Sequence, residues 1–278
     1  MKFETGPAGA ANDLNQLILA IKPLDSLAVG FSGGVDSSVV VAAAVEALGT
    51  GNVVAVTSDS ETLPVREMNA ARHLARKIGC RHEIIRTREL DMNEFAANPP
   101  DRCYYCKTEL WKQVRKIASE LGLKNIADGV NASDLGDFRP GIRAGDECGV
   151  AHPLAAIGAG KEQVRGIAKQ LGLPNWDKPA EACLSSRFPY GNAITATGLK
   201  RVEQAEELLK EHGFRQLRVR DHGNIARIEV PPEMFHKLTN GSRSEIVKGL
   251  KELGYSYVTV DLEGFRSGSM NETLKHSF

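Results

Sequence analysis

The sequence lacks the features that mark membrane, fibrous and disulfide-rich proteins. Only 6% of its 278 residues are aromatic, and no apolar run approaches the ~20 residues that a bilayer-spanning helix needs. The first twelve residues lack the apolar core of a secretion signal. Five cysteines are too few for a disulfide scaffold in a chain of this length. We therefore expect a cytoplasmic protein that does not associate with membranes.

An excess of charge of either sign is also absent, because 35 Lys and Arg residues balance 35 Asp and Glu residues. Proteins that bind the nucleic-acid backbone unaided usually carry a broad basic surface. The balance of charge argues against nucleic acid as a partner, although it does not exclude a local basic groove. With 42% hydrophobic and 25% charged residues, the composition is that of a globular protein of one large domain or two unequal ones.

Up to about residue 180, short β-branched runs alternate with amphipathic stretches, which is the pattern of a parallel sheet flanked by helices. The expected strands are 27–31, 53–57, 82–86 and 125–130, and the expected helices are 37–48, 64–78, 106–121 and 161–171. This order predicts an α/β fold with a doubly wound parallel sheet in a first domain, 1–190.

Periodicity lapses near 188–197, where Pro, Gly and Asn cluster, and we place the domain boundary there. The remainder, 191–278, predicts a smaller α+β domain for substrate binding or oligomerisation. Its expected helices are 197–212, 231–238 and 244–253, and its expected strands are 216–221, 225–230 and 255–261.

A glycine loop follows the first expected strand directly and leads into a helix, with the sequence SGGVDSS at 32–38. Adjacent glycines let backbone N–H groups approach a ligand, and a helix N-terminus adds unsatisfied donors and a positive dipole end. The residues expected to hold an anion are Ser32, Gly33, Gly34, Ser37 and Ser38. Asp36 is placed to cap the helix or to hold Mg²⁺. The alternative is an ordinary glycine turn with a serine-rich cap.

This loop resembles the signature of the PP-loop ATP pyrophosphatases, which holds the pyrophosphate portion of ATP. The resemblance implies a five-stranded nucleotide-hydrolase-like sheet. It also implies cleavage of ATP between its α and β phosphates, with transfer of AMP to an oxygen of the acceptor and release of PPi. No lysine stands where a Walker A loop needs one, and the glycine spacing is not that of a dinucleotide fold.

Polar residues also follow two later strands, at the edge where a doubly wound sheet gathers its active site. Ser58, with Asp59 and Ser60, is expected near the adenosine, unless this segment is an ordinary polar turn. Asp128 and Asn131, with Asp134, are expected to orient Mg²⁺ or the nucleotide, although Asn and Asp also simply make turns.

Three of the five cysteines have a spacing that indicates a shared ligand. Cys103 and Cys106 form a CxxC motif at the start of an expected helix, and Cys183 lies far along the chain. A CxxC motif lets two thiolates reach one metal or cluster, and a remote third thiolate completes the attachment. An iron–sulfur cluster, zinc, thiol–disulfide chemistry and structural thiols all stay open. Cys80 and Cys148 have no such partners.

Several unrelated motifs sharpen the family resemblance. They are Arg102-Cys103-Tyr104-x-Cys106-Lys107, Asp128-Gly129-x-Asn131 with Asp137-x-Arg139, Lys178-Pro179 with Cys183-Leu184-x-Ser186-Arg187, and Gly264-x-Arg266-x-Gly268-Ser269. Together they resemble the LarE-type sulfur transferases, and the resemblance covers nearly the whole chain. Those enzymes act on pyridinium-3,5-biscarboxylic acid mononucleotide during assembly of the nickel-pincer nucleotide cofactor of lactate racemase.

The resemblance implies how sulfur is supplied. In family members with a single cysteine at the position of Cys183, that residue gives up its own sulfur and becomes dehydroalanine. The present chain adds Cys103 and Cys106, and it is similar to the subgroup whose three cysteines hold a [4Fe–4S] cluster that delivers sulfide. We therefore expect Asp36 and the three cysteines to be catalytic, with ATP, Mg²⁺ and the cluster as cofactors. A homo-oligomer and other enzymes of nickel-pincer cofactor biosynthesis are the implied partners.

Arginines are the expected ligands of the small-molecule nucleotide substrate, because its phosphate favours fork-shaped cations. Arg218 and Arg220 share one face of an expected strand. With the family resemblance, Arg220 and Arg266 are expected to bind substrate or form an interface, and Arg187 is expected beside ATP and, if its segment is helical, near the Cys183 thiolate. The alternative for the strand is a solvated arginine face.

Two other functions stay open. A PP-loop tRNA thiolase with an iron–sulfur cluster would also use a CxxC motif and a further cysteine, although the neutral net charge argues against RNA as a substrate. A non-catalytic ATP-binding sensor would use the same sheet and would release no PPi with any acceptor.

Overall fold

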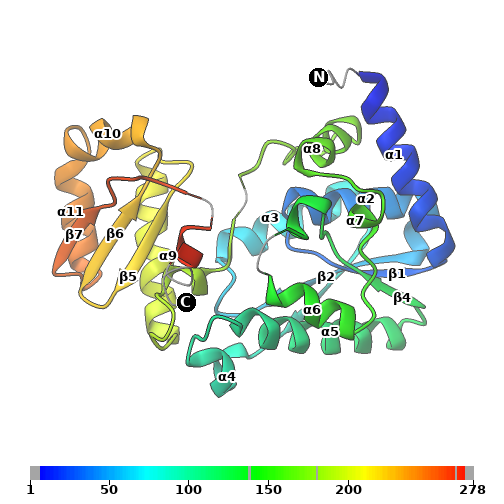
Figure 1. Ribbon diagram of the computed structural model, residues 1–278, viewed down its shortest axis with the longest axis horizontal. Helices are drawn as coiled ribbons and strands as arrows, with labels where there is room; N and C mark the ends of the chain where they lie inside the picture. The colour runs from blue at the N-terminus through cyan, green and yellow to red at the C-terminus, as the bar shows by residue number, and fades with distance from the viewer. Residues whose placement is uncertain (1–6, 137–138, 180, 267, 273–278) are drawn as a thin grey trace. The chain divides into compact units, whose positions relative to one another are not determined.

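The computed structural model describes residues 7–136, 139–179, 181–266 and 268–272, and the chain divides into two compact units (Figure 1). The N-terminal unit comprises Met1–Glu89 and Asp101–Glu181. The C-terminal unit comprises Leu90–Pro100 and Ala182–Phe278. Asp137, which belongs to one of the family motifs, lies outside the described residues. No helix in the described part of the chain is long and apolar enough to cross a membrane.

A parallel sheet of order β3-β2-β1-β4 forms the centre of the N-terminal unit. Its strands are β1 (Leu27–Gly30), β2 (Val53–Asp59), β3 (Arg81–Arg86) and β4 (Asn125–Ala127). The α/β architecture with a parallel sheet and a smaller second sheet is confirmed. The implied fifth strand is wrong for the described residues, where only Ala151 forms a single parallel bridge beside β4. Pro153 follows two residues later and begins a helix, and since proline lacks the N–H of a ladder, the bridge does not extend.

Helices cover both faces of this sheet because successive strand residues point to opposite sides (Figure 1). Leu27 and Val29 pack in the core shared with α1, α2, α3 and α8, whereas Ala28 packs in the core shared with α5. The helices are α1 (Pro7–Ile21), α2 (Val35–Leu48), α3 (Val65–Ile78), α5 (Arg102–Glu120), α6 (Pro140–Glu147), α7 (Pro153–Ala156) and α8 (Lys161–Gln170).

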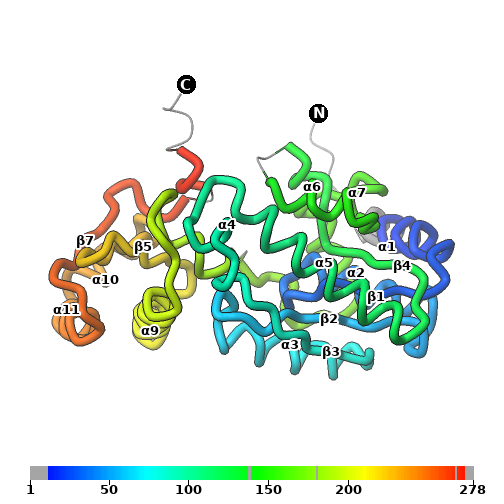
Figure 2. The backbone as a smooth tube through the Cα atoms, turned by 90° about the horizontal axis from the view of Figure 1, so that it is seen from below, coloured from blue at the N-terminus to red at the C-terminus, as the bar shows by residue number. Residues whose placement is uncertain are grey.

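The C-terminal unit contains a three-stranded sheet of order β5-β6-β7. Its strands are β5 (Arg218–His222), β6 (Ile225–Glu229) and β7 (Tyr257–Val260), and its helices are α4 (Asn93–Ala96), α9 (Ala196–Glu211), α10 (Phe235–Thr239) and α11 (Arg243–Glu252). One sheet face buries Val219 and Ile228 against the helices, and the alternate residues Arg218 and Arg220 lie on the other face. Figure 2 traces α4 directly before α5 along the chain.

Helix α5 begins at Arg102, four residues before the start that the sequence pattern indicates. Its first turn, with charged and aromatic side chains around two cysteines, has no apolar periodicity and therefore gave no helix signal. The CxxC motif consequently lies within the first turns of a helix, where residues three apart are neighbours on one face.

Candidate active site

The segment 32–34 joins β1 to α2 as an open polar loop. Gly33 has a φ of +70°, and a Cβ atom there would lie 3.1 Å from Ala71, so only glycine fits without displacing its neighbours. Ser32 Oγ lies 3.2 Å from Ser37 Oγ and accepts from Gly34 N at 3.3 Å. These are long contacts, so the Ser32 and Ser37 hydroxyl groups are only weakly held, whereas Ser38 Oγ donates to the Gly34 carbonyl at 2.6 Å and is committed to the loop itself.

Asp36 lies in the first turn of α2 and accepts a hydrogen bond from Asn131 Nδ2 at 3.1 Å. Asn131 follows β4 and caps a short turn that contains Asp134. Burial first, and then the carboxylate of Asp134, raise the pKa of Asp36. The structure thus brings the predicted residues Asp36 and Asn131 together beside a second carboxylate. A divalent cation would offset the repulsion between the two carboxylates, and oxygen ligands of this kind suit Mg²⁺.

In the part of the chain that the structure describes, no three His, Cys, Asp or Glu side chains converge as a metal site. This is compatible with Mg²⁺ in a nucleotide site, where one or two carboxylates and the phosphates supply most of the ligands besides water. It also means that the described residues contain no assembled cysteine cluster.

Asp128 is engaged by a histidine that the sequence did not single out. His152 Nδ1 lies 2.7 Å from Asp128 Oδ1, and His152 Nε2 lies 3.1 Å from Asp146 Oδ1. The hydrogen bond with Asp128 raises the pKa of His152. The next residue, Gly129, packs directly on the start of α2, since a Cβ atom there would lie 2.6 Å from Ser37 N. The end of β4 therefore supports the glycine loop.

Two further residues reach the loop from the segment after α8. Lys178 Nζ lies 3.5 Å from the carbonyl oxygen of Gly33 and forms an ion pair with the buried carboxylate of Glu67. Asn175 Nδ2 donates to the Gly33 carbonyl at 3.2 Å and to Ser38 Oγ at 3.1 Å. A cation thus lies beside the loop although the loop sequence contains none. Lys178 belonged to a family motif, whereas nothing in the sequence pattern marked Asn175.

A chain of hydrogen bonds connects the end of β2 with the CxxC motif. Ser58 Oγ is hydrogen-bonded to Thr87 Oγ1, which donates to Glu89 Oε1 at 2.8 Å. Cys106 Sγ lies 3.8 Å from the same Glu89 oxygen. Glu89 is only 2% exposed, and Cys103 and Cys106 are half-buried. The structure therefore places the predicted nucleotide residue Ser58 and the predicted ligand Cys106 in one hydrogen-bonded network.

Cys183 belongs to the C-terminal unit, where its exposed side chain precedes a turn at Leu184–Arg187. Arg187 is fully buried, and its Nε and Nη2 donate to the two carboxylate oxygens of Glu206 at 2.8 Å each. Its Nη1 donates to the carbonyl oxygens of Ala182 at 2.7 Å and Cys183 at 3.0 Å. Burial is the largest single influence on Glu206 and opposes its ionisation. The charge and hydrogen bonds of Arg187, with the charge of Arg218 and the Val219 amide, together outweigh burial and lower the pKa of Glu206. Arg187 thus holds the backbone that carries Cys183.

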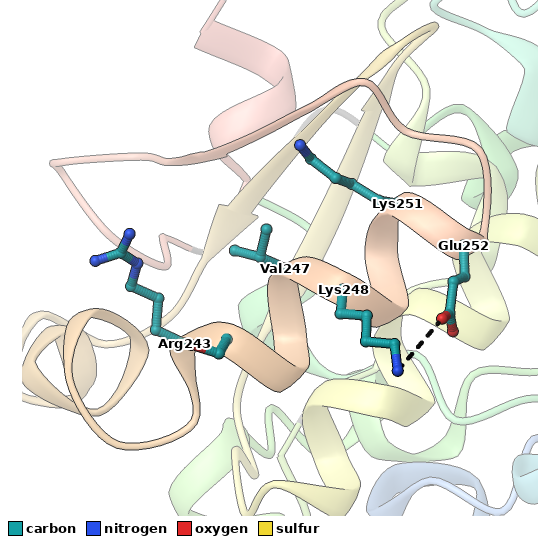
Figure 3. Close-up of a pocket in the computed structure, with 6 residues that line it drawn as sticks. Arg243, Val247, Lys248, Lys251 and Glu252 are labelled. Carbon is teal, nitrogen blue, oxygen red and sulfur yellow. Dashed lines mark ion pairs between the residues drawn. The ribbon is translucent and has the colours of Figure 1, made fainter.

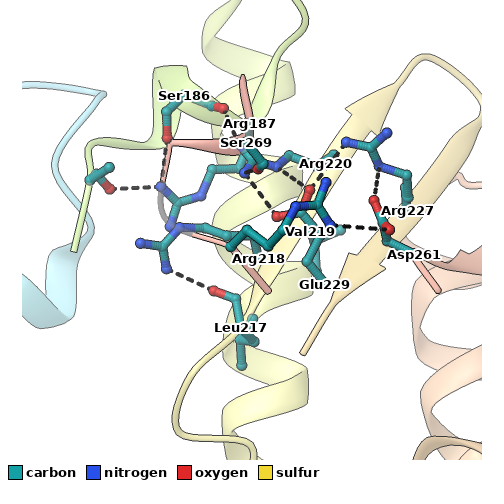
Figure 4. A network of polar contacts seen from close by, with 12 residues as sticks. Ser186, Arg187, Leu217, Arg218, Val219, Arg220, Arg227, Glu229, Asp261 and Ser269 are labelled. Carbon is teal, nitrogen blue, oxygen red and sulfur yellow. Dashed lines mark hydrogen bonds and ion pairs between the residues drawn. The ribbon is translucent and has the colours of Figure 1, made fainter. Parts of the chain in front are cut away.

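Arg220 lies in the same polar network (Figure 4). Its Nε and Nη2 donate to the carboxylate of Glu229 at 2.8 Å, Nη1 donates to the Ser186 carbonyl at 2.6 Å, and Nη2 also reaches Ser269 Oγ at 2.9 Å. Four of its five N–H groups thus have partners among the described residues. Arg266 is more exposed and pairs with the carboxylates of Glu263 and Glu272.

A surface hollow along α11 is lined mainly by charged side chains (Figure 3). They are Arg243, Lys248, Lys251 and Glu252, together with Ser244 and Val247. Lys248 pairs with Glu252 at 3.9 Å. None of the site residues predicted from the sequence lines this hollow.

The parallel sheet, the SGGVDSS loop and the helix behind it define a PP-loop α/β protein. In agreement, residues 13–101 match the family model for NAD synthase. The chain is 38% identical, over 93% of both chains, to the pyridinium-3,5-bisthiocarboxylic acid mononucleotide synthase of Lactiplantibacillus plantarum, and it belongs to this LarE-type family.

Two other relatives show how far each similarity extends. An uncharacterized protein of Synechocystis sp. is 46% identical over 90% of this chain and 94% of the relative. An NH3-dependent NAD+ synthetase of Chlorobaculum tepidum is 28% identical over 57% of this chain and 58% of its own. The similarity to NAD synthetases is thus partial, whereas the similarity to the LarE-type synthase extends through both units.

Proposed function

We propose that the chain is an ATP-dependent sulfur transferase that converts a carboxylate of pyridinium-3,5-biscarboxylic acid mononucleotide into a thiocarboxylate for the nickel-pincer nucleotide cofactor. The observation that carries this proposal is the 38% identity to the LarE-type synthase over 93% of the chain. An open glycine loop with Asp36 and Asn131 at its helix supports the use of ATP with Mg²⁺.

The chemistry has two steps. The substrate carboxylate attacks the α-phosphorus of ATP, which forms an acyl adenylate and releases PPi. Sulfide then attacks the acyl carbon, the C–O bond to AMP breaks, and the thiocarboxylate and AMP leave. ATP is needed because AMP is a far better leaving group than the oxide of a carboxylate.

The N-terminal unit supplies the groups for the first step. The donors of 32–38 suit the PPi portion, and Asp36, Asn131 and Asp134 suit Mg²⁺, which neutralises phosphate charge when bound. Lys178 supplies a cation beside Gly33 that the loop itself lacks. We propose that Lys178 stabilises the departing PPi, with Ser58 and Asp128 as further nucleotide residues. Arg187, which the sequence predicts beside ATP, is buried against Glu206, and we propose that it acts instead on the backbone of Cys183.

The second step needs a source of sulfide, and we propose Cys103, Cys106 and Cys183 as the three ligands of a [4Fe–4S] cluster. Cys103 and Cys106 lie three residues apart on α5, which suits two thiolates of one cluster. A cluster held by three cysteines would supply an iron without a protein ligand, where an external sulfide can bind. Arg266 and Arg220 are the proposed substrate residues, and Arg220 would act through the one N–H group, on Nη1, that has no partner among the described residues. We also propose a cytoplasmic homo-oligomer that works with other enzymes of nickel-pincer cofactor biosynthesis.

The proposal is tested with anaerobically purified protein. Incubation with ATP, Mg²⁺, the mononucleotide and added sulfide should yield PPi and AMP, and mass spectrometry should show replacement of oxygen by sulfur in the product. Iron and sulfide analysis should find about four of each per chain, as the cluster formula requires.

Cys103→Ala should abolish iron binding and product formation while PPi release persists, and Cys80→Ala is the matched control because Cys80 packs against the core of the N-terminal unit. PPi release without any thiocarboxylate would contradict the transferase, and unchanged iron in Cys103→Ala would contradict the cluster.

A further inference from the structure

The chain passes between the two units three times, after Glu89, after Pro100 and after Glu181. Both cysteine motifs directly follow such crossings. Cys103 is the third residue after Pro100, and Cys183 is the second residue after Glu181. The segment Leu90–Pro100 is an excursion of the chain into the C-terminal unit, and it returns just before the CxxC motif.

Asn98 fixes the end of this excursion to the loop that follows Cys183. Its Nδ2 contacts the carbonyl oxygens of Phe188 at 3.2 Å, Pro189 at 2.8 Å and Asn192 at 3.0 Å. The backbone carbonyl of Asn98 accepts from Gly191 N at 2.9 Å. One asparagine therefore contacts four backbone groups of this loop.

The arrangement of Asn98 has an energetic cost. The residue is 0% exposed, and its φ of +57° lies in the left-handed region that side chains other than Gly, Asn and Asp rarely adopt. Its Oδ1 is buried without a hydrogen-bond partner among the described residues. Costs of this kind persist where the surrounding structure enforces the geometry, and they are often found at functional sites.

A continuous set of contacts leads from Asn98 to Cys183. Phe188, which accepts from Asn98, directly follows Arg187, and Arg187 Nη1 donates to the Cys183 carbonyl at 3.0 Å. On the other side, Pro99 and Pro100 form a stiff connection to the first turn of α5. Three residues span at most about 10 Å, so the chain itself limits how far Cys103 can lie from Pro100.

We propose that Asn98 is a positioning residue for the three thiols. It holds the chain five residues before Cys103 to the loop that follows Cys183, so the covalent connection through Pro99 and Pro100 limits the separation of the CxxC thiols from Cys183 however the two units are arranged. The inference rests on the proposed function, in which these thiols act together.

The test measures thiol proximity directly in the full-length, iron-free protein. Dibromobimane bridges two nearby thiols by displacement of its two bromides, and peptide mapping by mass spectrometry identifies the bridged pairs. The readout is the yield of bridges from Cys183 to Cys103 or Cys106, relative to the Cys103–Cys106 bridge in the same sample. A purely structural role for Asn98 would alter the melting temperature without altering this ratio.

Asn98→Ala should lower the ratio about tenfold. Asn98→Gly should lower it as well, while it retains the left-handed φ and so guards against a variant that fails to fold. Asn192→Ala is the matched control, because its exposed side chain is removed while the carbonyl that accepts from Asn98 remains.

An unchanged ratio in both Asn98 variants would overturn the positioning role and leave the thiol trio intact. An absence of any bridge to Cys183 in the unaltered protein would overturn the trio itself, and the positioning role with it.

Discussion

The glycine loop and the network around Cys183 differ in how far their polar side chains are engaged by the protein. In the glycine loop, the contacts of Ser32 with Gly34 and Ser37 are 3.2 to 3.3 Å long, although Ser38 donates to the Gly34 carbonyl at 2.6 Å. Around Cys183, Arg187 from the loop and Arg220 from β5 donate to carboxylates and carbonyls at 2.6 to 3.0 Å. Ser32 is thus weakly held, whereas the two arginines are largely committed to protein acceptors.

This difference teaches that a residue type alone does not define a role in a site. Arg187 and Arg220 are buried, and their fork geometry matches a carboxylate on one side and loop carbonyls on the other. They hold Cys183 in place through its backbone.

The largest effect should come from breaking the buried pair of the Cys183 loop. Arg187→Met should destabilise the C-terminal unit by about 3–5 kcal/mol, because it leaves the Glu206 carboxylate buried without its cation. The measurement is hydrogen exchange of the Val219 amide, which donates to Glu206 Oε1 at 3.0 Å.

Two variants sharpen this prediction. Adding Glu206→Gln to Arg187→Met should recover part of the loss, since no unpaired charge remains. Arg266→Met should cost about 1 kcal/mol or less, because Arg266 is partly exposed and pairs with exposed carboxylates. Equal losses for Arg187→Met and Arg266→Met would show that burial of the Arg187–Glu206 pair does not determine what the pair contributes to stability.

The next effect concerns the glycine loop, where Asp36→Asn should separate function from stability. PPi release should fall about 100-fold or more, as for the loss of a key electrostatic group. Removal of the buried charge should raise the free energy of unfolding, and the melting temperature should rise by about 2–4 °C for each ~1 kcal/mol gained. Burial raises the pKa of Asp36, so its ionised form costs stability at any pH well above the unfolded value of 3.8.

Calorimetry and a PPi assay check both parts of this prediction. Asp13→Asn on α1 is the control and should change neither quantity. A variant of Asp36 that loses stability while it keeps PPi release would show that this carboxylate is structural.

The smallest effect should be a pH dependence from His152. Its pKa is raised in the folded protein, so the stabilisation is fully present below the unfolded value of about 6.5 and is lost as the pH rises through the folded value. The melting temperature should therefore decline between pH 6 and pH 8.5 by the equivalent of about 1 kcal/mol or less. His152→Gln should flatten this component, and exposed His73→Gln should not. Identical profiles for all three proteins would exclude the pair with Asp128 as the cause.

The two central strands of the N-terminal unit were predictable because they are buried along most of their length. Continuous apolar runs marked β1 and β2 within two residues of their observed ends. The strand expected at 125–130 stops at Ala127, because Asp128 turns toward His152 and Gly129 packs on α2. The hydrophobic pattern of the sequence does not reveal such side-chain contacts.

The site was only partly predictable, for a similar reason. Local signals revealed 32–38 and the CxxC motif, since each needs particular residues at fixed spacing. Lys178, Asn175 and Asn98 contact segments 90 or more residues away in sequence, and their partners include backbone carbonyls. Every residue has a backbone carbonyl, so no sequence motif indicates these contacts.

The C-terminal unit is built from two separate segments of the chain, which has a consequence for folding during translation. During translation, Leu90–Pro100 leaves the ribosome long before Phe188, its partner through Asn98. At synthesis rates of ~5–20 residues per second, this segment waits roughly 5–20 s without the acceptors it will finally bury. The C-terminal unit is consequently the last part of the chain to become complete. Cleavage of the backbone after Pro100 or after Glu181 would separate Leu90–Pro100 from Ala182–Phe278, so neither cleavage yields the whole C-terminal unit as one piece.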